Sequence, residues 1–176
     1  EKAPNMYLLL MTAIVTGMRA SSIARLKEED LMISVGGTPM IDITRDKTVA
    51  GVRQVPLPRP LFYALKDYLQ KNKNMGFRGD SADNYASAIS KANSRFKKLF
   101  GGETVEQLNA HDMRRSFNEY LKKRGVLLDI RTVVMGHVQR EVNVVSYTNG
   151  ISVDESAEVI SVIQEDLLQL MKFQFP

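Results

Sequence analysis

The sequence contains no cysteine, no tryptophan and only two histidines among its 176 residues. Without cysteine there can be no disulfide framework, no thiolate zinc site and no thiol nucleophile. The two histidines, His111 and His137, are too few for a histidine-rich catalytic zinc site without help from carboxylates. With 44% hydrophobic residues, a domain of this length can bury an ordinary core without stabilisation by disulfides or a metal ion. A metal centre is therefore the less favoured interpretation.

Long hydrophobic runs are also missing. The longest apolar stretch, from Met6 to Val15, is much shorter than the ~20 residues of a membrane-spanning helix and is interrupted by Thr12. We expect no membrane segment and a cytoplasmic location. The first residues include neither an initiator methionine nor a charged and then apolar leader. We expect one domain over residues 1–176 that forms part of a longer protein.

Positive charge is concentrated in the body of the chain, whereas the tail is acidic. The sequence has 24 Lys and Arg against 20 Asp and Glu, but residues 141–176 hold six acids and a single lysine. The densest basic stretch runs from Lys91 to Arg131. Clustered basic residues bind phosphates with release of counterions, so the pattern favours a nucleic-acid partner. On charge alone, a solvated helix surface is an equally good interpretation.

Hydrophobic periodicity predicts an α+β domain that is mainly α-helical, with a small three-stranded antiparallel sheet. Gly36 and Gly37 predict a hairpin between the first two strands, and a second turn is expected at 47–51. The expected strands, rich in apolar and β-branched residues, are 31–35, 40–44 and 52–57. The expected helices are 6–16, which ends at Gly17, then 20–27, one from residue 60 on, 88–99, 111–124, 128–135 and 153–171.

Several motifs place basic side chains where the backbone can fix them. Arg19 follows a helix stop at Gly17 and begins the next helix. His111 and Arg114 are three residues apart on a predicted helix, so they project from the same side and can grip one phosphate. Taken singly, each of these is more often a surface or salt-bridging residue than part of a site.

Other candidate chemistry is weaker when each motif is taken alone. No GxxxxGK[ST] or GxGxxG motif occurs, so nucleotide chemistry has no anchor. Asp42 and Lys47 on a hairpin suggest a metal-dependent nuclease, but the acid that precedes the lysine in such motifs is replaced by Arg45. His137 follows a helix-ending glycine, and Tyr147 precedes a polar turn, where a packed tyrosine is common.

In their order along the chain, these motifs closely resemble the catalytic domain of the tyrosine recombinases, the phage-integrase family. The resemblance covers about residue 6 to residue 170. Two departures are Ser22, where the family usually has an acid, and a gap between His137 and Tyr147 that is one residue longer than the commonest spacing. The motifs are Thr16-Gly-Met-Arg19-Ala-Ser-Ser-Ile-Ala-Arg-Leu26, Lys47 ahead of Arg53-Gln-Val-Pro-Leu57, His111-Asp-Met-Arg114, Met135-Gly-His137 and Tyr147.

The resemblance implies a site-specific recombinase or integrase that cuts and rejoins DNA through a 3′-phosphotyrosine, without metal, ATP or any other cofactor. Tyr147 would be the nucleophile, and Lys47 would protonate the leaving 5′ oxygen. The remaining basic residues would stabilise the charged phosphate or assist proton transfer. The implied catalytic residues are Arg19, Lys47, His111, Arg114, His137 and Tyr147.

The implied partner is double-stranded DNA, held with the help of an N-terminal DNA-clamping domain that this fragment lacks. The helix at 153–171 would pack into an adjacent protomer of a DNA-bound tetramer, or fold back on its own chain. Accessory DNA-bending or directionality proteins and a bacterial or phage origin are further expectations. Two alternatives stay open. One is a DNA-binding member of the fold that has lost catalysis; the presence of all six site residues argues against it, but the departure at Ser22 keeps it open. The other is a type IB topoisomerase, which shares the tyrosine chemistry.

Overall fold

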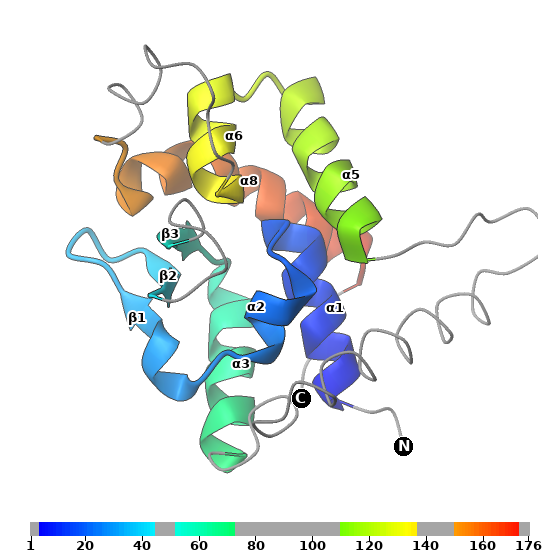
Figure 1. The fold of residues 1–176 in the computed structure, drawn as a ribbon, viewed down its shortest axis with the longest axis vertical. Coiled ribbons are helices and arrows are strands. Elements are labelled where there is room, and N and C mark those ends of the chain that lie inside the picture. Colours follow the sequence, from blue (N-terminus) through cyan, green and yellow to red (C-terminus); the bar gives the residue numbers. More distant parts are fainter. Residues whose placement is uncertain (1–3, 45–51, 73–109, 137–149, 173–176) are drawn as a thin grey trace, which may run out of the picture.

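The computed structural model describes residues 4–44, 52–72, 110–136 and 150–172. Figure 1 shows α1 running through the middle of the molecule, with the sheet on one side, α5 and α6 together at one end, and α8 crossing behind them. The elements in chain order are α1 (Pro4–Thr16), α2 (Ala20–Ala24), the 3-10 helix η1 (Glu28–Asp30), β1 (Leu31–Ile33), β2 (Pro39–Ile43), β3 (Arg53–Pro56), α3 (Arg59–Lys71), α5 (Ala110–Lys123), α6 (Leu128–Met135) and α8 (Val153–Leu170).

The predicted α+β architecture is confirmed for these residues. The strands form one antiparallel sheet in the order β1-β2-β3, with Ile41 of β2 opposite Leu31 on one side and Val55 on the other. The helix α2 is shorter than predicted because it ends at Ala24. The helix expected at 88–99 and the turn expected at 47–51 lie outside the described residues. Among those described, no helix is both long and apolar enough to cross a membrane.

The central helix α1 is buried because it is apolar on nearly all of its sides. Its side chains form one core with α2, α3 and the sheet. The buried threonines of α1 satisfy their hydroxyl groups within the helix, since Thr12 donates to the carbonyl of Leu8 at 2.7 Å and Thr16 to that of Thr12 at 2.5 Å. A second apolar cluster lies between α5, α6 and α8, and Leu167 of α8 packs against both clusters.

The apolar stripe of α8 is buried against its own chain. Its residues pack with α1 and β3, and Ile160 and Ile163 belong to the second cluster. Apolar spacing predicts that Leu170 belongs to this stripe, but the residue is 69% exposed and Leu168 is buried instead. The sequence pattern also missed Gln164, a buried polar residue whose Nε2 donates to the carbonyls of Val15 and Pro56, each at 2.9 Å.

The start of α8 is tied to the β1–β2 hairpin through Asp154. The Ser34 hydroxyl donates to one carboxylate oxygen at 2.5 Å, and the Gly36 N–H donates to the other at 3.3 Å. A Cβ at Gly36 would lie 2.6 Å from Cγ of Asp154, so only glycine allows this approach. The Ser34 hydrogen bond, followed by one from Thr38, lowers the pKa of Asp154 from its ordinary value of 3.8.

Replacing Asp154 with asparagine should therefore lower the free energy of unfolding. The loss relative to the wild type should be larger at neutral pH than in acid. A carboxyl whose pKa is lowered by folding stabilises the folded state above its unfolded pKa, and this contribution disappears as the pH falls through the lower folded pKa. Urea unfolding of both proteins at pH 7 and at pH 3 measures the difference. We expect a difference in midpoint at pH 7 that shrinks at pH 3; a difference independent of pH would contradict the role of the charge.

Candidate active site

The first predicted site motif begins at a tight turn that ends α1. Gly17, where the sequence predicted the helix to end, has a left-handed φ of +60°, and its N–H donates to the carbonyl of Ala13 at 3.0 Å. A Cβ at this position would lie 2.7 Å from Cδ1 of Phe117 in α5 and 2.8 Å from Sδ of Met135 in α6. The end of α1 therefore meets α5 and α6 at a point where only glycine fits.

The guanidinium of Arg114 lies at this meeting point. Its Nη1 donates to the carbonyl of Gly17 at 2.7 Å, and its Nη2 donates to the carbonyl of Met135. Arg114 is only 5% exposed, although a residue of this type, taken singly, is expected at the surface. A buried guanidinium needs hydrogen-bond acceptors, and two backbone carbonyls provide them, one in the turn after α1 and one in the last residue of α6. Arg114 thereby joins α1, α5 and α6.

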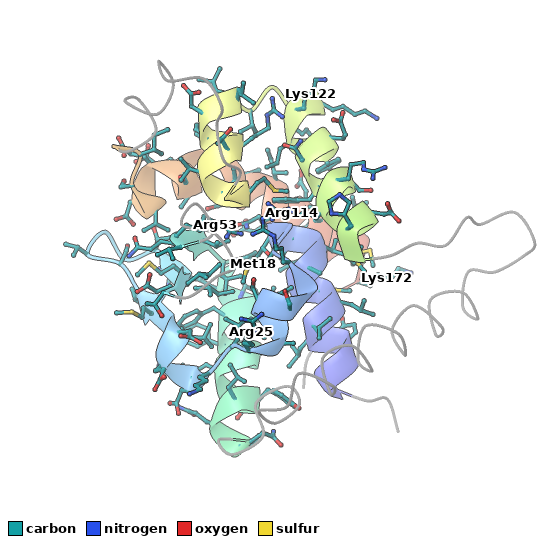
Figure 2. All side chains as sticks on the ribbon, in the orientation of Figure 1. Met18, Arg25, Arg53, Arg114, Lys122 and Lys172 are labelled. Atoms are coloured by element: carbon teal, nitrogen blue, oxygen red, sulfur yellow. The ribbon has the colours of Figure 1, made fainter. Side chains whose placement is uncertain are left out.

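The C-terminal end of α6 is held by a second arginine. Gly136 ends the helix in the left-handed conformation, with φ 60° and ψ 50°, and its N–H donates to the carbonyl of Val133 at 3.1 Å. The carbonyl of Val134 accepts a hydrogen bond of 2.8 Å from Nε of Arg53, the first residue of β3. Figure 2 shows the side chains of Arg53 and Arg114 near each other at the middle of the molecule, beneath α6.

Arg19 and His111 hold positions at helix starts, as predicted. Arg19 is the N-cap residue of α2, is half-buried, and its carbonyl accepts hydrogen bonds from the N–H groups of Ser22 and Ile23 at 2.9 and 3.1 Å. His111 lies in the first turn of α5 and is exposed, one turn before the buried Arg114. His111 and Arg114 thus lie on the same helix, but His111 is exposed whereas Arg114 is buried.

The other predicted site residues, Lys47, His137 and Tyr147, lie outside the described residues. The structure thus brings the Arg114 side chain to the backbone next to two of the predicted motifs, because Gly17 and Met135 each stand two residues before a predicted catalytic residue. Within the ranges described, no group of three or more carboxylate or histidine side chains could hold a metal ion.

Arg53 lies in one of the ordered motifs, but the motif indicates no role for it. The available signal was the alternation of β3, in which Arg53 and Val55 are buried whereas Gln54 is exposed. A charged residue on the buried side of a strand needs a fixed partner, and that partner, the end of α6, is distant in sequence. Spacing alone therefore could not identify it.

Comparison with known proteins agrees with the motifs and the fold. A model of the phage integrase family matches residues 2–150. Tyrosine recombinase XerA of Pyrococcus furiosus is 26% identical over 133 residues, which make up 74% of this chain and 45% of that protein.

Solved structures similar to this chain are also recombinases and integrases. The crystal structure of XerA recombinase superposes with a TM-score of 0.58 at 15% identity, over 98% of this chain and 58% of that one. The Tn1549 transposon integrase in complex with circular intermediate DNA superposes with a TM-score of 0.59 at 17% identity, over 88% of this chain and 56% of that one. XerH bound to its difH substrate superposes with a TM-score of 0.58 at 21% identity, over 89% of this chain and 45% of that one.

This chain spans about half the length of the relatives it matches. At such low sequence identities, the similarity to solved structures establishes the fold alone. The family model adds a match to the family's sequence pattern over most of the chain. The resemblance predicted from the ordered motifs is therefore confirmed. The chain belongs to the phage integrase family and has the fold of a tyrosine recombinase catalytic domain.

Proposed function

We propose that the chain is the catalytic domain of a site-specific DNA recombinase that cuts and rejoins strands through a covalent 3′-phosphotyrosine on Tyr147. Family membership supports this function. The structural observation that supports it best is the Arg114 guanidinium, which hydrogen-bonds the backbone two residues before Arg19 and two residues before His137. One side chain thus links three motifs that are far apart in sequence.

In the proposed reaction, the Tyr147 oxygen attacks the phosphorus of a phosphodiester, and the bond to the 5′ oxygen breaks. The tyrosine loses its proton, a step in which His111 would assist, and the departing 5′ oxygen gains a proton from Lys47. The phosphate remains joined to the protein and to the 3′ end of the strand. A 5′ hydroxyl of another strand then reverses the step, so no bond energy is lost and no ATP is needed.

Attack on the phosphodiester concentrates negative charge on its non-bridging oxygens. Arg19 and Arg114 are suited to stabilise this charge because the planar guanidinium donates two parallel hydrogen bonds, and His137 would donate another. Holding Arg114 by two backbone carbonyls fixes the guanidinium in advance, which reduces the reorganisation needed in the transition state.

We propose double-stranded DNA as the partner. The exposed basic residues of α5 and the DNA complexes of structural relatives, XerH with difH and the Tn1549 integrase with circular intermediate DNA, support this. The exposed basic side chains of α5 are Arg115, Lys122 and Lys123.

Self-association on DNA through residues 153–171, with help from accessory DNA-bending or directionality proteins, is the less supported part of the proposal. The apolar stripe of α8 is already buried within the chain, where Gln164 anchors it to α1 and β3. Contact through this helix would therefore use its exposed side chains, such as Val159 and Val162, or would require α8 to leave its place.

A cleavage assay that samples many DNA sequences at once tests the proposal. The probe is a pool of 5′-labelled duplexes with a randomised central sequence and a nick, so that the short strand released by cleavage diffuses away and the adduct accumulates. The protein that contains this chain is incubated with the pool in EDTA and without ATP, and the label is followed on a denaturing gel. We expect a labelled band at the mass of the protein plus DNA.

The same experiment separates the two classes of function. A protein that shifts the duplexes on a native gel but forms no adduct would be a DNA-binding member of the fold without catalysis. An adduct that forms only when magnesium is added would contradict the proposed metal-independent chemistry. The comparisons do not favour the type IB topoisomerase alternative, since the named relatives are recombinases and integrases.

A further inference from the structure

The C-terminal end of α6 is capped by two arginines that come from different elements. The last carbonyls of a helix have no partner within the helix, and a cation is favoured there because the helix dipole is negative at this end. The carbonyl of Val134 accepts from Nε of Arg53 at 2.8 Å, and the next carbonyl, of Met135, accepts from Nη2 of Arg114. Two successive carbonyls are thus held from outside the helix.

Arg53 approaches this helix end from a fixed position. It begins β3, where it pairs with Ile43 of β2, and it is 9% exposed. Burying a charged side chain is unfavourable unless it is hydrogen-bonded, and the planar guanidinium imposes a direction on those bonds. Because β3 also packs against α6 and α8, the sheet acts as the reference against which the end of α6 is placed.

We propose that Arg53 is a positioning residue that sets the place of His137. The chain leaves α6 through Gly136, whose left-handed conformation ends the helix, and His137 is the next residue. A hydrogen bond that fixes the carbonyl of Val134 fixes the direction in which the chain continues. Arg53 then acts on the reaction through His137, whereas Arg114 also contacts the phosphate. This inference rests on the proposed function in one respect, the role of His137 at the phosphate.

A double-mutant cycle tests whether Arg53 acts through His137. Single-turnover cleavage of a nicked duplex selected from the randomised pool is measured for Arg53→Met, for His137→Ala and for the two combined. Misplacing a catalytic group by about 1 Å lowers rates on the order of 100-fold, so Arg53→Met should slow cleavage by about 10- to 100-fold. In the His137→Ala background the same change should alter the rate by no more than about twofold. Equal losses in both backgrounds would overturn the proposal.

Arg131 provides a matched control on the same helix. Its Nε donates to the carbonyl of Val126 at 3.0 Å, just before the opposite end of α6, and its Nη1 donates to Oδ1 of Asn118 in α5 at 3.1 Å. Arg131→Met therefore removes an arginine–carbonyl bond without touching the end that leads to His137, and its cleavage rate should stay within about twofold of the wild type. If Arg131→Met slows cleavage as much as Arg53→Met, then general stability of α6 explains both, and the positioning role is lost.

A measurement without DNA keeps this inference separate from the proposed function. The chain has two histidines, so His111→Gln and His137→Ala variants of the protein that contains it each remove one imidazole NMR signal, which assigns both signals. We expect Arg53→Met, or the milder Arg53→Lys if the first fails to fold, to shift the His137 signal and leave the His111 signal in place. An unmoved His137 signal would overturn the positioning role even if the wild type forms the adduct. A shifted signal in a protein that forms no adduct would retain the positioning role and reject the proposed function.

Discussion

Replacing Arg114 with alanine is expected to slow single-turnover strand cleavage by about 100- to 1000-fold, the effect of removing a donor that stabilises a charged transition state. DNA affinity should fall only modestly, because other basic residues still contact the phosphates. Cleavage of a nicked duplex at saturating protein, compared with affinity from a native gel, separates the two effects. A variant that binds poorly but cleaves at the normal rate once bound would contradict this role.

The structure adds a loss of stability to this expectation. Removing the guanidinium leaves the buried carbonyls of Gly17 and Met135 without this donor, and an unsatisfied buried acceptor costs about 1–3 kcal/mol. Cleavage must therefore be compared at a temperature where both proteins are folded. Arg115→Ala is the matched control on the same helix. Arg115 is exposed, and its Nη2 lies 3.8 Å from Oδ1 of Asp112, which makes a weak surface ion pair. It removes the same charge and should leave both stability and the cleavage rate of bound DNA nearly unchanged.

Replacing Gly17 with alanine is expected to destabilise the fold more than any other small change at the site. The left-handed φ of +60° costs a non-glycine residue about 1–2 kcal/mol. The new Cβ would also lie 2.7 Å from Phe117 and 2.8 Å from Met135, and such overpacking costs roughly 1–3 kcal/mol. Urea unfolding, with the slope of the transition held in common, measures the sum.

Gly125 separates the two contributions to this loss. Its φ is +79°, but a Cβ there would meet nothing within 4 Å. Gly125→Ala should therefore show only the backbone strain, and Gly17→Ala should lose clearly more stability. Equal losses in the two variants would mean that Phe117 and Met135 move aside freely, and that α1, α5 and α6 are not held closely at Gly17.

The sequence was sufficient to predict the elements that rest on local chemistry. The helix at 6–16 ends at Gly17 because a left-handed residue was needed there, and the glycine pair at 36–37 does form the β1–β2 hairpin. Apolar periodicity also located α5 and α6. These features depend on neighbouring residues, so a single chain reveals them.

Contacts between distant elements were harder to predict. Gln164 is polar, yet it is buried because the carbonyls of Val15 and Pro56 converge on it from α1 and β3. Arg114, taken singly, is expected at the surface, but it is buried because the turn after α1 and the end of α6 supply acceptors. Neither acceptor can be recognised from the residues that surround these side chains in the sequence.

In the candidate site too, local features could be predicted from the sequence, whereas contacts between distant elements could not. The ordered motifs identified the family and placed Arg19 and His111 at helix starts, which the structure bears out. They could not reveal that Arg53 holds the end of α6, because that bond joins residues on β3 and α6. The structure tests the positions of the described site residues and not their chemistry. The catalytic roles remain predictions that rest on the family pattern for all six residues, Arg19, Lys47, His111, Arg114, His137 and Tyr147.

Mapping the residue that carries the DNA is the most direct test of the proposed function. Trypsin should release Tyr147 in one peptide, residues 141–172, because no Lys or Arg lies between Arg140 and Lys172, and Tyr147 is its only tyrosine. The adduct formed in EDTA is digested with trypsin and nuclease, and the modified peptide is identified by mass spectrometry. We expect a nucleotide on Tyr147 and no adduct from Tyr147→Phe. A nucleotide on another residue, or an adduct that persists in Tyr147→Phe, would contradict the account.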